Sequence, residues 1–303
     1  MKKFVIRIFV FSLPILLCFI ALEGTLRNIP NNYTYKAHYI KNNAAEIETL
    51  ILGNSHTFFG VNPSYMPPKT FNAAQVSQSL NYDYHILINR ETNWKKLKKI
   101  YLPISYFTMW SNLNTGIESW RSKFYYHSYG IKENLDFKDY FFISQKFSTS
   151  IRDVSKFLLK KKDHVECNEF GWGTSYNSKK LMNLEVTGAS ASKRHTKKIS
   201  SPEIMEVFDK NRWYLNEISN WAKKKDVEVV FFTPPAYISY RNNLDSKQFS
   251  LTVKTINSIV NKHHNCKYIN LINSSIFKKE DFYDADHLNG IGAKKLSELL
   301  TKL

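Results

Sequence analysis

The stretch that decides the fold covers residues 50–56 and reads Leu50-Ile51-Leu52-Gly53-Asn54-Ser55-His56. A short apolar run of this kind, preceded by acidic residues, is typical of a buried strand. Its last residues are polar and include a serine immediately after the strand. In parallel sheets, sites form at the carboxyl ends of the strands. The segment therefore predicts a buried first strand that presents the Ser55 hydroxyl in a loop.

A second informative segment lies near the other end of the chain, where Tyr283-Asp284-Ala285-Asp286-His287 precedes the expected last helix. A histidine accepts the proton of a serine near neutral pH, and a carboxylate behind it fixes the tautomer. We predict Ser55 as the nucleophile, His287 as the base and Asp284 as the residue that orients His287. Asp286 is expected to be an exposed neighbour or a helix-start residue. The alternative is that Ser55 only caps a helix and His287 only orders a loop.

The rest of the chain alternates between strand and helix patterns. Strands are expected at 49–52, 70–74, 100–109, 227–233 and 267–272, and helices at 79–88, 204–222, 249–260 and 296–303. Such alternation predicts an α/β domain with three α/β/α layers around a parallel sheet. Residues 111–200 depart from this rhythm and are rich in aromatic and polar residues. We expect them to form an insertion with helix near 140–159, whose aromatic residues either pack on the sheet or stack on sugars.

Composition narrows the range of partners. The 303 residues carry a formal net charge of +17, with lysine runs at 95–99, 160–162 and 223–225. A basic chain is attracted to polyanions, so binding of an anionic polymer without chemistry is one hypothesis. We expect instead that these runs are solvated helix ends and loops. No nucleic-acid-binding motif accompanies them, so nucleic acid is not expected as a partner.

Cysteine and histidine spacing gives no sign of a metal centre. Cys18 falls in the apolar N-terminal run, whereas Cys167 and Cys266 could pair in an oxidising compartment. His263 and His264 are adjacent rather than at ligand spacing, and His195 stands alone. We expect no metal and no cofactor.

The N-terminus has the pattern of a membrane anchor. Residues 4–22 are almost wholly apolar, and Lys2, Lys3 and Arg7 precede or open the run. This length just spans a bilayer, and the basic flank predicts a cytoplasmic N-terminus. A small-residue cleavage site is missing, which favours an anchor over a cleavable signal peptide. We predict an anchor at 1–26, a stalk at 27–46 and an extracytoplasmic (periplasmic or cell-surface) domain at 47–303 that contains the 111–200 insertion.

These motifs together resemble the SGNH (GDSL-type) hydrolase superfamily of esterases and acyltransferases. Gly53-Asn54-Ser55-His56 resembles its first block, and Asp284 with His287 matches its last. The resemblance is closer to membrane-anchored SGNH-like proteins of bacterial cell envelopes, including those that work with acyltransferases on surface polysaccharides. It covers most of 48–112 and 227–303 and implies a flavodoxin-like SGNH fold.

The resemblance also implies an oxyanion site. Asn72-Ala73-Ala74 is similar to the second block, usually Asn-x-Gly, so the backbone N–H groups of Ser55 and Ala74 are the expected donors. The third block, Gly-x-Asn-Asp, is not recognisable after the third strand. The positional candidates for its side-chain donor are Ser105, Asn112 and Asn114.

Two functions follow as expectations. The first is a serine-dependent acyl-ester hydrolase or O-acyltransferase acting on cell-envelope glycan, with an acylated carbohydrate or other ester as substrate and a membrane acyltransferase as a partner. The second is a catalytically weak SGNH-fold binding or scaffold protein of a polysaccharide-modifying complex, which the missing third block supports.

Overall fold

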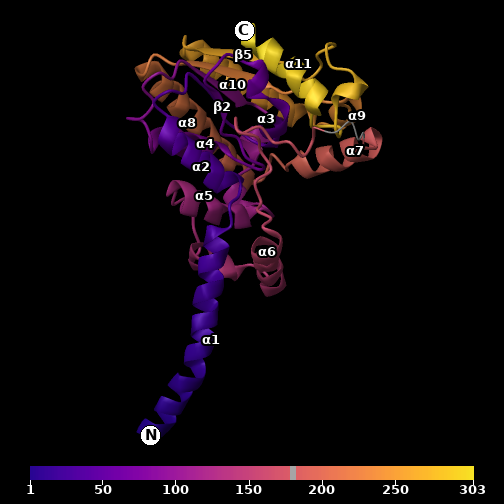
Figure 1. Ribbon diagram of the computed structural model, residues 1–303. Helices are drawn as coiled ribbons and strands as arrows, with labels where there is room; N and C mark the ends of the chain where they lie inside the picture. Colours follow the sequence, from indigo (N-terminus) through magenta and orange to yellow (C-terminus); the bar gives the residue numbers. More distant parts are fainter. Residues whose placement is uncertain (178–181) are drawn as a thin grey trace.

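A five-stranded parallel sheet forms the centre of the protein, as the computed structural model shows for residues 1–177 and 182–303 (Figure 1). The strand order is β2-β1-β3-β4-β5, and all neighbouring strands are parallel. This confirms the predicted α/β fold. The strands are β1 (Thr49–Ile51), β2 (Thr70–Asn72), β3 (Lys99–Pro103), β4 (Glu228–Thr233) and β5 (Cys266–Asn270).

Both faces of the sheet are buried, because alternate side chains of each strand point to opposite sides. Leu50, Ile100 and Phe231 belong to one apolar cluster. Ile51 and Val230, each next to one of these residues in the chain, belong to another. The strands therefore lie between two layers of helices, as the continuous apolar runs in the sequence predicted.

The helices cover the sheet on both sides. One cluster is formed with side chains of α2, α4, α8 and α10, and the other with side chains of α11. The α-helices are α1 (Lys2–Asn28), α2 (Asn32–Asn43), α3 (Ser55–Gly60), α4 (Leu80–Ile88), α5 (Ser122–Tyr129), α6 (Phe147–Lys160), α7 (Leu184–His195), α8 (Pro202–Lys224), α9 (Ile238–Arg241), α10 (Ser246–Lys262) and α11 (Gly290–Thr301). Short 3₁₀ helices lie at Pro63–Tyr65, Thr108–Trp110, Leu113–Thr115, Ser119–Arg121, Phe137–Tyr140, Phe142–Ser144 and Lys279–Asp281.

The third strand is shorter than the expected 100–109. β3 ends at Pro103, and the following chain turns, with the Thr108 N–H donating to the Ser105 carbonyl at 2.9 Å. The apolar residues beyond this turn, Met109 and Trp110, are buried in the same cluster as Phe208 of α8. Burial by a helix therefore produced the apolar pattern that suggested a longer strand.

The prediction of a stalk at 27–46 was wrong. Most of this segment is α2, whose Tyr33, Ala37 and Ile40 are buried in the main core. These residues follow helical spacing, which the surrounding polar residues obscured. Asn31 caps the helix by accepting hydrogen bonds from the backbone N–H groups of residues 33 and 34. The folded domain thus begins almost directly after the end of α1.

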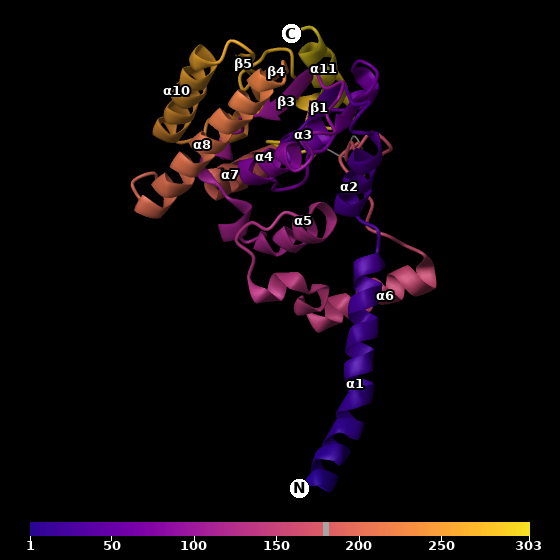
Figure 2. The same cartoon turned by 90° about the vertical axis from the view of Figure 1, so that its left-hand side faces the viewer.

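The N-terminal helix α1 projects from the domain as a long rod, with the C-terminus at the opposite end of the molecule (Figures 1 and 2). Its most apolar 18-residue window has a mean hydropathy of 2.6 and is 0% buried. The helix is long and apolar enough to cross a membrane, as the sequence predicted.

The insertion at 111–200 contains α5, α6, α7 and several 3₁₀ helices, and α6 lies close to the predicted helical region at 140–159. Residues 178–181 of the insertion are outside the described residues. Cys167, next to a tight turn in this insertion, is a free thiol, and so are Cys18 and Cys266. The pairing of Cys167 with Cys266 is therefore not present in this structure.

Candidate active site

Ser55 is positioned by a sharp turn between β1 and α3. Gly53 has a φ of +104°, a conformation that glycine tolerates, and a Cβ on it would lie 2.3 Å from Pro103 Cδ. Asn54 then caps α3 by accepting the His56 N–H at 3.0 Å. Because the turn leaves β1 beside the end of β3, Ser55 emerges where the strand order reverses, which is the usual position of a ligand site in such sheets.

Ser55, His287 and Asp284 converge as the sequence predicted. His287 Nε2 lies 2.8 Å from Ser55 Oγ. On the other side of the ring, His287 Nδ1 lies 2.9 Å from Asp284 Oδ1 and 3.1 Å from Oδ2. The N–H groups of Asp286 and His287 both donate to Asp284 Oδ1, at 3.1 and 2.8 Å, which fixes the carboxylate behind the ring. The three side chains have the geometry of an activated serine.

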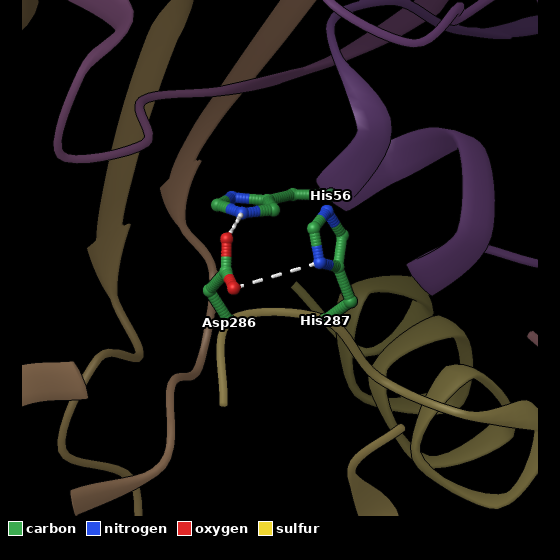
Figure 3. A group of neighbouring side chains, drawn as sticks. All are labelled: His56, Asp286 and His287. Carbon is green, nitrogen blue, oxygen red and sulfur yellow. Dashed lines mark hydrogen bonds and ion pairs between the residues drawn. The ribbon is translucent and has the colours of Figure 1, made fainter. Parts of the chain in front are cut away.

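Asp286 was expected to be an exposed neighbour or a helix-start residue, and both expectations were wrong, since the residue is buried and α11 begins at Gly290 with Asn289 as its cap. The residue is only 3% exposed, and its carboxylate points between the imidazoles of His56 and His287 (Figure 3). It lies 3.4 Å from His56 Nε2 and 3.7 Å from His287 Nδ1. The reason is the tight turn in which Asp284 Oδ1 accepts the N–H groups of Asp286 and His287. This turn directs the side chain of Asp286, as well as that of Asp284, toward the site. Asp284 remains the closer partner of His287.

The two aspartates control the charge of His287. Burial alone would disfavour the charged imidazole, but the negative charges of Asp286 and Asp284 outweigh it and raise the pKa of His287 to about 9. Burial also opposes ionisation of Asp286, yet the adjacent His287, followed by His56, holds its pKa well below the usual range. At neutral pH the resting site therefore contains a protonated His287 between two carboxylates.

Two further histidines complete this buried group, and sequence reasoning gave neither of them a role. His56 Nδ1 lies 2.8 Å from Ser105 Oγ, and burial lowers the pKa of His56. His195 Nδ1 lies 2.8 Å from the Tyr240 hydroxyl and 4.0 Å from Asp286 Oδ2, and burial lowers its pKa to about 3. Both rings are therefore neutral at neutral pH. The position of His56 next to Ser55 was the available signal, whereas nothing in the sequence linked His195 to Asp286.

The expected oxyanion donor Ala74 does not face the site. Its N–H donates to Asn72 Oδ1 at 3.0 Å, and the residue is fully buried. The side chain of Asn72 thus occupies the donor that the sequence comparison assigned to the oxyanion. The other expected donor, the Ser55 N–H, makes no hydrogen bond to any group in residues 1–177 and 182–303.

Asn112 is the best placed of the three candidates for a side-chain donor. It lines the same cavity as Ser55, and among residues 1–177 and 182–303 its side chain makes one hydrogen bond, in which Oδ1 accepts the Asn114 N–H at 2.9 Å. Ser105 is directed to His56, and the Asn114 side chain bonds to Tyr82 and Glu133. The loop after β3 therefore supplies a candidate although the Gly-x-Asn-Asp pattern is missing there.

A cavity of about 710 Å³ opens onto Ser55 and His287. Part of its wall comes from the insertion, including Asn112, Ile117, Tyr176 and Arg194. Tyr176 stacks on Phe59, with ring centroids 3.9 Å apart, and on Tyr283 at 4.0 Å. The aromatic residue nearest the triad is thus held by packing, and the insertion as a whole shapes the space that a substrate would enter.

Basic side chains form part of the cavity wall. Arg194 and Lys197 line it, and the Arg194 guanidinium makes no ion pair within the described parts of the chain. The nearby Glu118 is already paired with Arg121 at 2.9 Å. Asp83, which accepts the Gly53 N–H at 2.8 Å, is buried, and this raises its pKa to about 7. Arg194 and Lys197 therefore favour a ligand that carries negative charge at their side of the cavity.

The trio in Figure 3 could in principle offer three ligand atoms to a metal, since one atom of each residue lies within 4.8 Å of the others. The ring nitrogens are already used, however. His287 contacts Asp284 and Ser55 through its two nitrogens, and His56 contacts Ser105 and Asp286. A metal would have to displace these hydrogen bonds, so we assign none.

Comparisons with known proteins do not place the chain in a family. No protein-family model matches the chain, and no curated protein matches it. Among solved structures it is similar to one from Streptococcus pneumonia provisionally described as a platelet activating factor, with 10% identity, a TM-score of 0.44, and coverage of 97% of this chain and 98% of the other. A likeness at this level carries no argument about fold or activity, so both are argued from this structure.

Proposed function

We propose that the protein is a membrane-anchored serine esterase or O-acyltransferase of the SGNH type, acting on acyl esters of cell-envelope glycan outside the cytoplasm. The observation that carries the proposal is the line from Ser55 Oγ through His287 to Asp284, with contacts of 2.8 and 2.9 Å. The cavity at Ser55 and the apolar helix α1 support the substrate access and the location.

The geometry supports acyl transfer in two halves. Neutral His287 Nε2 takes the proton of Ser55 Oγ as the oxygen bonds to the ester carbonyl carbon, and Asp284 stabilises the resulting imidazolium. His287 then donates this proton to the leaving alkoxide, which departs as an alcohol and leaves an acyl-serine. In the second half, His287 deprotonates water or a sugar hydroxyl, which attacks the acyl-serine and restores Ser55. Water gives hydrolysis and a sugar gives transfer.

The negative oxygen of the intermediate requires hydrogen-bond donors. The Ser55 N–H and the Asn112 side-chain amide are two donors at the cavity that have no hydrogen-bond acceptor among the described residues. Losing one such donor costs about 3 kcal/mol of barrier stabilisation, so two donors in place of three would slow but not abolish turnover.

A serine-reactive fluorophosphonate tests the proposal. We expect stoichiometric labelling of the full chain at a pH above 9, where His287 is neutral, and complete loss of labelling in Ser55→Ala. Ser64→Ala, on an exposed turn, serves as the matched control and should label normally. Mass spectrometry of the labelled peptide identifies the modified residue.

The same experiment separates the second candidate, a scaffold protein with little activity. The occupied Ala74 N–H favours it, as do the two carboxylates that raise the pKa of His287 and so disfavour the neutral base at pH 7. A folded sample that neither labels nor cleaves an acetyl ester at any pH would support the scaffold and contradict the enzyme.

The charge of the cavity predicts a substrate preference. Relative to the wild type, the double variant Arg194→Gln/Lys197→Gln is expected to lose roughly two- to thirtyfold in kcat/KM for an aryl ester with a carboxylate on its acyl chain, because two partly exposed charges contribute about 0.2–1 kcal/mol each. Turnover of the neutral aryl acetate should change little. Lys193→Gln, an exposed residue of α7 outside the cavity lining, is the control. Equal losses for both esters would contradict the preference.

A further inference from the structure

Part of the insertion is fastened to the end of α1. Arg27 Nη2 donates to the Tyr140 carbonyl at 2.8 Å. The two carboxylate oxygens of Glu23 accept the N–H groups of Phe142 and Ile143 at 3.1 and 2.8 Å. These charge-assisted bonds fix residues 140–143 to the last turns of α1.

Helix α6 packs beside the same last turns of α1. Its Val154 and Phe157 pack with Leu22 and Leu26 in a small apolar cluster. In Figure 2, α6 runs sideways from α1 and lies apart from the sheet and its helices. The apolar run of α1 ends at residue 22. The hydrogen bonds of Glu23 and the packing of α6 therefore lie where a spanning helix would leave the hydrocarbon.

A stripe of apolar side chains on α6 is left open. Phe147, Ile151 and Leu158 are 60, 43 and 62% exposed. Their spacing, i, i+4 and i+11, places them on one face of the helix, next to the face that packs on α1. Solvent exposure of three large side chains in a row is unfavourable unless another apolar phase covers them.

Basic residues accompany this stripe. Lys156 and Lys160 lie on the opposite face of α6 by helical spacing, and Lys161 and Lys162 follow its end. An apolar stripe opposite a lysine-rich face is the pattern of a helix that lies in the surface of an anionic bilayer.

We propose that α6 lies in the outer interfacial layer of the membrane crossed by α1, with Phe147, Ile151 and Leu158 inserted among anionic lipids. The inference rests on the proposed membrane anchor but not on the proposed catalysis. The occupant is a lipid surface because the stripe is continuous with α1 at the point where α1 would leave the bilayer. The hydrogen bonds of Glu23 and Arg27 to residues 140–143 then hold the domain at a fixed height above that surface.

A fluorescent label at single cysteines of the full chain tests this. Three versions are compared in vesicles of phosphatidylcholine and phosphatidylglycerol: native Cys18 alone, Leu158→Cys and Lys160→Cys, the last two with Cys18 replaced by alanine. Cys167 and Cys266 are replaced by serine and alanine in all three. The label is the environment-sensitive dye NBD, and the quenchers are lipids with a nitroxide near the headgroup or deep in the acyl chain. Ile151→Cys provides a second site on the stripe.

We expect the headgroup-proximal nitroxide to quench the label at 158 roughly twofold or more beyond the label at 160, because an interfacial helix buries its apolar face by about 5–10 Å. The label at Cys18 should be quenched by the deep nitroxide. Quenching of the label at Cys18 together with no quenching at 158 and 151 would overturn the proposal. This holds even if the dye at 158 or 151 reports an apolar environment, because protein alone could provide it. No quenching at Cys18 would overturn the anchor and this inference together. Fluorophosphonate labelling of the same samples reports on the catalytic proposal separately.

Discussion

Ester turnover is expected to fall by about 10⁴-fold or more when His287 is replaced by alanine, since loss of the base from a serine triad removes proton transfer in both halves of the reaction. The physical reason is local: His287 Nε2 is 2.8 Å from Ser55 Oγ, and no other ring nitrogen in the described chain contacts that oxygen. A 10⁴-fold loss corresponds to about 5.4 kcal/mol of barrier. The measurement is kcat with an aryl acetate.

The matched control is His264→Ala. His264 is exposed before the start of β5, at the end of the sheet opposite the site, and its replacement should leave turnover unchanged. Thermal unfolding of both variants, followed by circular dichroism, separates lost chemistry from lost structure. Turnover of folded His287→Ala within tenfold of the wild type would show that His287 is not the base.

Replacing Asp286 with asparagine is expected to shift the pH dependence of kcat/KM. Only neutral His287 can accept the serine proton, so wild-type kcat/KM should rise with pH up to the pKa of about 9. Burial already disfavours the charged ring, and Asp286 is the foremost of the charges that oppose this effect. Removing its charge lowers the pKa of His287, so the rising limb should move to lower pH by about one unit or more.

The sign of the effect on rate depends on pH. Near neutrality the variant has more neutral His287 and should be the faster enzyme, whereas above pH 9 it should be slower because the imidazolium formed during reaction is less stabilised. Glu280→Gln, an exposed acid before the same loop, is the control. Pre-steady-state acylation rates across pH make the measurement. An unchanged limb would mean that Asp286 acts on packing rather than on His287.

The reacting groups of the site could be predicted from the sequence because each belongs to a short local pattern. Ser55 follows an apolar run that only a buried strand would need, and Asp284 lies within one turn of His287. The surroundings depend instead on long-range packing. Asp286 lies in the loop before α11 and His195 at the end of α7, and no local sequence pattern predicts that these two residues are close in space. Ala74 was missed for a different, local reason, because its N–H donates to the side chain of Asn72, only two residues earlier in the chain.

The fold was predictable to a similar degree. Strands buried on both faces produce continuous apolar runs, so β1 and β4 stand out, whereas α2 was hidden because its buried face is narrow and its other residues are polar. The apolar stretch after Pro103 was wrongly predicted to continue the third strand. Its side chains are buried under α8, and such burial does not require strand pairing. Burial is what the sequence pattern reports, and it does not reveal which neighbour provides it.

The absence of a flexible tether has a consequence for how the protein meets its substrate. Only residues 29–31 separate α1 from α2, and α2 is part of the main core. With α1 in a bilayer, so short a link would limit how far the domain can move away from the membrane surface. Ser55 would work at one distance from the membrane, and an acyl group or acceptor would have to be presented there. Delivery of the reactants, rather than the reach of the enzyme, would then set the rate in the cell.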